Sequence, residues 1–144
     1  MQQQWPEYLP VVQVRVARPT ARLSEVVRFY RDALGLRQIG AFKDHAGYDG
    51  VMLGLPGSAY HLEFTQYVAG SPCPAPSPDN LLVLYIADKT ARDRLVARMR
   101  AHGHEPVAPE NPYWAEKGVT FADPDGWRVV LMNTAGINDN DAAW

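Results

Sequence analysis

The chain has little of what marks a redox-dependent, nucleic-acid-binding or membrane protein. Cys73 is its only cysteine, which excludes an intrachain disulfide and a cluster of thiolate ligands. Its 14 Lys and Arg against 16 Asp and Glu give a net charge of -2, so no positive field attracts nucleic acid. No apolar run reaches membrane-spanning length, and the first residues lack the charged and apolar parts of an export signal. We therefore expect a cytoplasmic protein with no nucleic-acid and no membrane partner.

The same order of predicted elements occurs twice along the chain. A strand, helix, strand, strand, strand pattern runs from Val11 to Tyr67 and again from Leu81 to Asn133. Each predicted helix ends just before a glycine, Gly35 or Gly103, the residue that most often closes a helix. Such an internal duplication predicts two tandem βαβββ modules.

The predicted strands follow from β-branched and alternating segments between turn signals. In the first half they are Val11–Val16, Arg37–Phe42, Val51–Leu55 and Tyr60–Tyr67. In the second half they are Leu81–Ile86, a short strand at Val107, Val119–Phe121 and Arg128–Met132.

A single domain is the natural prediction for 144 residues. Module 1 covers about 10–67, a proline-rich linker 68–80, module 2 about 81–133 and a C-terminal tail 134–144. The linker prolines exclude helix and central strand. Neither half buries a one-sided sheet alone. We predict an α+β fold in which the two modules form a half-open barrel around a cavity.

Two motifs at matching places resemble the vicinal oxygen chelate superfamily. They are a Phe-Tyr-x-x-x-Leu-Gly helix end starting at Phe29 and an Asp-Pro-Asp-Gly turn starting at Asp123. This superfamily includes glyoxalase I, extradiol dioxygenases, fosfomycin-resistance transferases and bleomycin-binding proteins. The resemblance covers nearly the whole chain and implies a single-domain, glyoxalase-like member.

The resemblance also implies where a metal ion would be held. Metal-dependent members place one ligand on the first and last strand of each half, and these positions fall on Val11, Glu63, Leu81 and Val130. Only Glu63 donates a lone pair, whereas a divalent ion usually needs at least three protein donors. We therefore expect no metal ion and no other cofactor.

Strand parity predicts which polar side chains face the cavity. His61 and Glu63 lie two apart on one strand and point to the same side. The same parity adds Gln13 and Arg15 from the first strand, and Tyr85 and Arg128 from the second half. Arg15 and Glu63 form either a purely structural ion pair or part of a site. A histidine beside a carboxylate is a candidate general base, so His61 and Glu63 are the candidate catalytic residues.

Two loops supply further candidate ligand-binding residues. His45 and Tyr48 lie in a glycine-bounded loop, either as a solvated turn or at the cavity mouth. Tyr113 and Trp114 follow Pro112 and either plug the barrel end or form an aromatic ligand wall.

The resulting hypothesis is a metal-independent glyoxalase- or bleomycin-resistance-like protein that encloses a small organic molecule. It acts as a binding or resistance protein, or by acid-base catalysis through His61 and Glu63. The alternative is a metal-dependent lyase, isomerase or dioxygenase whose ligands are His61, Glu63 and a donor such as His45. The expected ligand is anionic or aromatic, because guanidinium groups match carboxylates and phosphates. Exposed strand edges and the long linker predict a homodimer.

Overall fold

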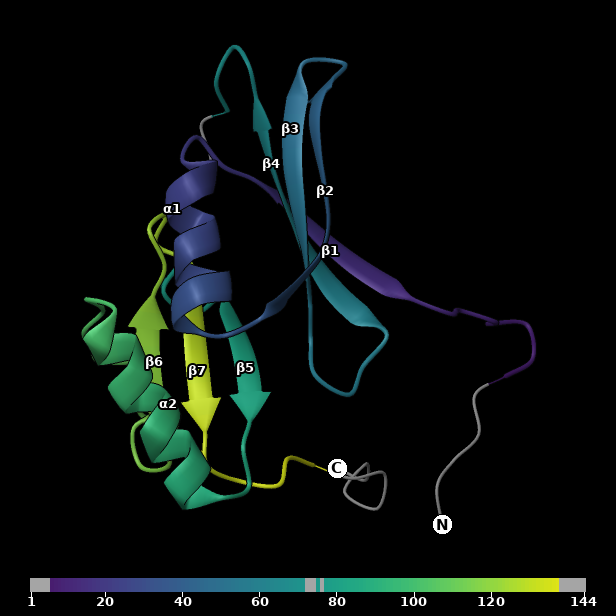
Figure 1. The fold of residues 1–144 in the computed structure, drawn as a ribbon. Helices are drawn as coiled ribbons and strands as arrows, with labels where there is room; N and C mark the ends of the chain where they lie inside the picture. Colours follow the sequence, from purple (N-terminus) through teal and green to yellow (C-terminus); the bar gives the residue numbers. More distant parts are fainter. Residues whose placement is uncertain (1–5, 72–74, 76, 138–144) are drawn as a thin grey trace.

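The computed structural model describes residues 6–71, 75 and 77–137, so Cys73 lies outside the described part of the chain. The architecture is α+β, with two βαβββ modules, as the duplicated pattern predicts. The described strands form two separate sheets that do not close into a barrel. Figure 1 shows the two sheets at an angle to each other, with α2 against the second sheet and α1 near their junction.

The first module carries a four-stranded sheet. Its elements are β1 (Val14–Pro19), α1 (Leu23–Val27), a π-helical turn η1 (Arg28–Ala33), β2 (Arg37–His45), β3 (Tyr48–Gly54) and β4 (Tyr60–Tyr67). The strand order is β1-β4-β3-β2. β1 runs parallel to β4 and places Arg15 beside His61 and Ala17 beside Glu63. Paired residues share a side of the sheet, so this register sets which side chains meet.

The second module repeats this connectivity in a smaller sheet. Its elements are β5 (Leu81–Tyr85), α2 (Lys89–Ala101), a 3-10 turn η2 (Pro112–Trp114), β6 (Gly118–Ala122) and β7 (Arg128–Met132). The order is β5-β7-β6, with β5 and β7 parallel and β6 and β7 antiparallel. The strand expected at Val107 is reduced to a single bridge to Thr120.

One core joins the two modules. The Phe64 ring of β4 stacks on Tyr30 of η1 with ring centres 4.9 Å apart. Leu131 of β7 and Met99 of α2 belong to the same buried cluster. The side of the first sheet that carries Leu62 and Phe64 therefore faces the helices and the second module. The opposite side, which we call the outer face of the first sheet, carries Arg15, Ala17, His61, Glu63 and Thr65.

Several predicted strand boundaries are wrong in the first module, including the end of β1, which is Pro19 rather than Val16. β1 begins at Val14 rather than Val11, and the Val12 side chain is 88% exposed. β1 begins at Val14 because its partner strand β4 begins at Tyr60, which lies beside Val14. The Val14 N–H already donates to the carbonyl of Ala59, the residue before β4. Nothing on β4 lies beside Val11. β2 and β3 extend towards each other until only Ala46 and Gly47 separate them, both with positive φ, as in a tight two-residue hairpin turn.

Candidate functional site

A three-residue network lies on the outer face of the first sheet, with its histidine buried beneath an exposed arginine. Arg15 Nε donates to His61 Nε2 over 2.8 Å, and Arg15 Nη1 lies 3.5 Å from Glu63 Oε2. The His61 residue is only 3% exposed and the Glu63 side chain 12%, while Arg15 covers them with a side chain that is 47% exposed. The structure thus brings the two candidate catalytic residues and Arg15 together on one side of the sheet, but this side faces away from the second module instead of into a cavity shared with it.

The contact with Arg15 determines which ring nitrogen of His61 accepts a hydrogen bond. A guanidinium has only donors, so His61 Nε2 must accept, and the proton of the neutral imidazole lies on Nδ1. This Nδ1 is buried and has no hydrogen-bond partner among the described residues. Buried polar atoms are nearly always paired, so an orphaned donor needs an explanation. A ligand atom that accepts a hydrogen bond supplies one.

His61 also lines a hollow at one end of the outer face. This hollow has a volume of about 460 Å³ and lies beside the turn that joins β3 and β4. Gln13 and Arg37 line it as well. Gln13 thus lies near His61, although it precedes β1 instead of standing within a strand. The polar lining consists mainly of groups that can donate to a ligand.

The residues of this face do not fit a divalent metal ion. Among the described residues, no three His, Cys, Asp or Glu side chains are grouped as a metal site would need. β1 faces β4 with Arg15 and Ala17 rather than with Val11, which precedes the strand. Arg15 carries a permanent positive charge and already pairs with Glu63. A cation bound at Glu63 would have to displace or approach that charge.

His45 and Tyr48 lie on the same sheet but far from Glu63. The register pairs His45 with Tyr48 and Tyr48 with Tyr67, four residues beyond Glu63 on β4. Tyr48 and Tyr67 contact each other with ring centres 4.8 Å apart. His45 is therefore not placed as a third donor beside His61 and Glu63. The two residues stand at the end of the β2–β3 hairpin, and neither lines the hollow of His61.

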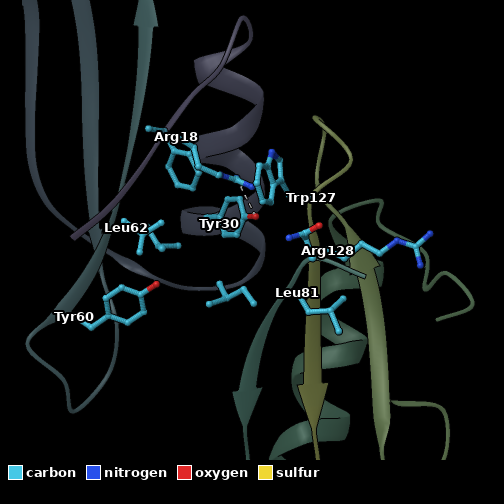
Figure 2. Close-up of a pocket in the computed structure, with 11 residues that line it drawn as sticks. Arg18, Tyr30, Tyr60, Leu62, Leu81, Trp127 and Arg128 are labelled. Carbon is cyan, nitrogen blue, oxygen red and sulfur yellow. Dashed lines mark hydrogen bonds between the residues drawn. The ribbon is translucent and has the colours of Figure 1, made fainter. Parts of the chain in front are cut away.

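Four predicted site residues lie in the second module and away from His61. Tyr85 lines a hollow between β5 and the β3–β4 turn, which adjoins the hollow of His61 at Pro56, Ser58 and Tyr60 but does not include His61. Arg128 donates to the Ala108 carbonyl over 2.9 Å, and Figure 2 shows its guanidinium directed away from the hollow drawn there. Tyr113 and Trp114 contact each other edge to face in η2, which packs against β6. Within one chain, these side chains do not share a hollow with His61.

An ion pair between the modules was missed by the sequence reasoning. Arg18 Nη2 lies 2.8 Å from Asp123 Oδ2, and the Tyr30 hydroxyl donates to the same oxygen over 2.7 Å. The Arg18 guanidinium also lies over the Trp127 ring, 4.6 Å from its centre, and over Phe64 at 4.9 Å. The only sequence signal was the Asp-Pro-Asp-Gly motif itself, which does not name its partner.

The buried hydroxyl of Tyr30 stays protonated in this arrangement. Burial raises the pKa of Tyr30 well above its ordinary value of 10.0, and the Asp123 carboxylate raises that pKa further. Tyr30 therefore donates to Asp123 throughout the physiological range. Its role is structural, since it connects the helix of one module to the turn of the other.

Two family models cover most of the chain. That of the YycE-like N-terminal domain matches residues 14–65, and that of the YycE-like C-terminal domain matches residues 79–133. The YycE protein of Bacillus subtilis (strain 168) is 52% identical over 126 residues, which cover 88% of this chain and 91% of that protein. A crystal structure of a YycE protein of unknown function from Bacillus subtilis superposes with a TM-score of 0.89 at 48% identity, covering 94% of this chain and 99% of that one.

More distant solved structures share the fold. The trypanothione-dependent glyoxalase I of Leishmania major superposes with a TM-score of 0.65 at 21% identity, over 85% of this chain and 86% of that one. The fosfomycin resistance protein FosX of Mesorhizobium loti superposes with a TM-score of 0.61 at 17% identity, over 85% of this chain and 90% of that one. These likenesses establish the architecture that the two sequence motifs imply.

Proposed function

The chain belongs to the YycE-like family, within the vicinal oxygen chelate fold, and from this premise we propose that it binds a small anionic organic molecule without a metal ion. The binding site is the outer face of the first sheet, around His61. The observation that carries the proposal is the His61 Nδ1 atom, buried and without a hydrogen-bond partner among the described residues. A carbonyl or carboxylate oxygen of the ligand accepts a hydrogen bond from Nδ1.

The same network assigns roles to the candidate acid-base pair. Arg15 holds His61 in the tautomer that donates from Nδ1, so His61 polarises a ligand carbonyl instead of removing a proton. Glu63, the neighbouring carboxylate, is then the group able to accept a proton. A base needs hydrogen-bond reach of the proton that it takes. If the protein catalyses a reaction, we expect proton abstraction beside a carbonyl group, with Glu63 as the base.

Charge supports metal independence. Glu63 is the one metal donor that the superfamily pattern retains, and the fixed cation beside it is Arg15, 3.5 Å away. The guanidinium occupies the place where a divalent ion would balance the carboxylate. We expect far less than one equivalent of Zn, Ni, Mn or Fe per chain after dialysis, measured by elemental analysis. About one equivalent would contradict the proposal.

The binding test uses His61 as its own reporter. Long-range ¹H–¹⁵N correlation spectra should show the Nδ1-protonated tautomer in the free protein. Addition of pyruvate or fosfomycin, two small anions that carry oxygen acceptors, should shift the His61 ring nitrogens saturably. In H61Q, followed by titration calorimetry because the reporter ring is gone, we expect affinity to fall by about tenfold or more, because the variant loses the hydrogen bond from Nδ1. E63Q should not weaken the binding of an anion, since it removes a negative charge from the site.

H102Q is the matched control, since His102 is exposed at the end of α2, and its affinity should equal that of the wild type. A wild-type spectrum with the proton on Nε2 would overturn the assigned roles. The absence of any His61 shift across a panel of small anions would overturn the site.

A cytoplasmic location stays a prediction from the sequence.

A further inference from the structure

A second hollow lies at the junction of the two modules, on the opposite side of β1 and β4 from His61. Figure 2 shows it between the two modules, with Arg18 and Trp127 near one end and Tyr60, Leu62 and Leu81 along its walls. Val16 and Leu62 pair across β1 and β4 on this side. The hollow is therefore distinct from the outer face, and its lining comes from both halves of the chain.

The size and walls of this hollow suit one small ring. Its volume is about 170 Å³, room for on the order of ten water molecules. Most of the lining is aromatic or aliphatic, with Tyr60, Leu62 and Leu82 on the sides and Trp127 at one end. Concave apolar sites with a few polar groups are typical of small-molecule binding.

The polar groups of the lining can donate but offer no free carboxylate. Arg18 uses only Nη2 for Asp123 and Tyr30, and its Nε and Nη1 have no partner among the described residues. Asn80 accepts from the Ser77 hydroxyl through Oδ1, which leaves its amide hydrogens available. No Asp or Glu is among the described residues that line the hollow, and the Asp123 side chain behind Arg18 is fully buried. A ligand here is favoured if it brings hydrogen-bond acceptors.

We propose that the module junction is a second binding site, for a small aromatic monocarboxylate. The ring lies among Tyr60, Leu62 and Trp127, and the carboxylate accepts from Arg18 and Asn80. Among the described residues, Tyr60 is the only one that lines both this hollow and the hollow beside His61, and β1 and β4 lie between Arg18 of the one and His61 of the other, so the two sites should bind independently.

Benzoate is the probe, and the fluorescence of Trp127 is the reporter. We expect saturable quenching with a Kd below about 1 mM, lost in W127F, while H61Q and E63Q bind as the wild type does. V16F should block the hollow, because Val16 lines it and its side chain projects from an edge strand with 42% exposure. V14F is the matched control: Val14 lies on the same side of β1, is 48% exposed and is not among the lining residues.

Two further variants test the charge of the hollow separately from its shape. N80D places a carboxylate in the lining at an exposed position and should weaken benzoate by about tenfold without weakening benzyl alcohol. Q38E makes the same amide-to-acid change at another exposed position. It should change the affinity for neither benzoate nor benzyl alcohol. Three results overturn the proposal: no saturable benzoate binding, equal binding by V16F and V14F, or equal effects of N80D on benzoate and benzyl alcohol. If light scattering shows that V16F alters the oligomeric mass while benzoate fails to bind, a second copy covers the hollow and the proposal is wrong.

Discussion

Asp123 connects the two modules by using each carboxylate oxygen for a different purpose. Its Oδ1 accepts from the backbone N–H groups of Asp125 and Trp127, at 2.8 and 3.0 Å, and so closes the turn before β7. Its Oδ2 accepts from Arg18 and Tyr30 of the first module. A motif residue that shapes a local turn thereby also fixes how the modules meet.

Replacing Asp123 should be among the most destabilising single changes in the chain. D123A leaves the Arg18 guanidinium, whose side chain is 15% exposed, without its carboxylate. Breaking a buried pair by removing one partner costs about 3–5 kcal/mol, so the free energy of unfolding from urea titration should fall by that amount. D32A is the control, because Asp32 pairs with Arg31 at the surface and should change little. A loss equal to that of D32A would show that the modules are held by apolar packing alone.

His104 should make the stability depend on pH. Its ring packs edge to face on the buried Phe29 ring, with centres 4.8 Å apart. Burial lowers the pKa of His104 below its ordinary value of 6.5, and the neighbouring His102 lowers that pKa further. The unfolded chain therefore takes up this proton first, so the stabilisation is complete above pH 6.5 and is lost as the pH falls below it.

The measurement is the urea midpoint of the wild type and H104L across this range. We expect the wild-type midpoint to drop on acidification and the drop to be smaller in H104L. Equal drops in both proteins would assign the pH dependence to other groups.

At the residue scale, the sequence identified the chemistry of the candidate site but not all its partners. Arg15, His61 and Glu63 were predictable because two adjacent strands of known parity bring odd-numbered residues to one face. Arg18 was read only as the end of a strand, since its partners Asp123 and Trp127 lie more than a hundred residues away. No local pattern encodes a contact of that separation.

Among the elements, the turn η2 explains why β6 begins with glycine. The Trp114 carbonyl lies directly over Gly118, and a Cβ there would also meet Val130 and Met132. This loop covers the side of the second sheet that carries Val130, which is fully buried. The aromatic loop that the sequence placed at a barrel end therefore packs on the second sheet.

G118A should consequently displace η2. The added methyl group meets backbone, which gives less readily than a side chain, so we expect a loss of roughly 1–3 kcal/mol in urea unfolding and a changed Trp114 environment by NMR. G40A is the matched strand glycine, because its added Cβ meets only the flexible end of Met52. It should leave stability nearly unchanged. Equal losses would show that strand glycines are costly to replace here for another reason.

Element boundaries were predicted best where a turn fixes the start of a strand. β4 and β7 were placed correctly at Tyr60–Tyr67 and Arg128–Met132, because Pro56-Gly57 and the Asp-Pro-Asp-Gly turn precede them. The start of β1 was wrong because Val11 and Val12 have the same β-branched character as Val14. Only the length of the partner strand β4 decides where pairing begins.

At the scale of the whole molecule, the sequence predicted two modules but not the direction of their faces. Leu62 and Phe64 on one sheet and Val129 and Leu131 on the other contribute to one core. The alternate residues of both sheets, including Glu63 and Val130, therefore point away from it.

Among the described residues no helix is long and apolar enough to cross a membrane.

The arrangement of the two modules leaves an open strand edge in each sheet with which a second copy would pair. β1 is the edge strand of its sheet, and Val14 on it is 48% exposed. β5, the edge strand of the second sheet, is likewise paired on one side only. Exposed edges with β-branched side chains favour pairing with another chain. We therefore predict a two-fold homodimer in which β1 of one copy lies along β5 of the other, so that outer faces from two chains border one site.

Light scattering at micromolar concentration should give twice the 16.0 kDa of one chain, because a stable dimer of this kind buries more than about 1,000 Å². V14K places a charge on the exposed edge and should shift the mass towards one chain, since edge lysines oppose strand pairing. V68K is the control: Val68 is 81% exposed and follows β4 instead of lying on an edge strand. A wild-type mass near that of one chain would contradict the dimer. A dimer that survives V14K but not V68K would place the interface at the linker instead of β1.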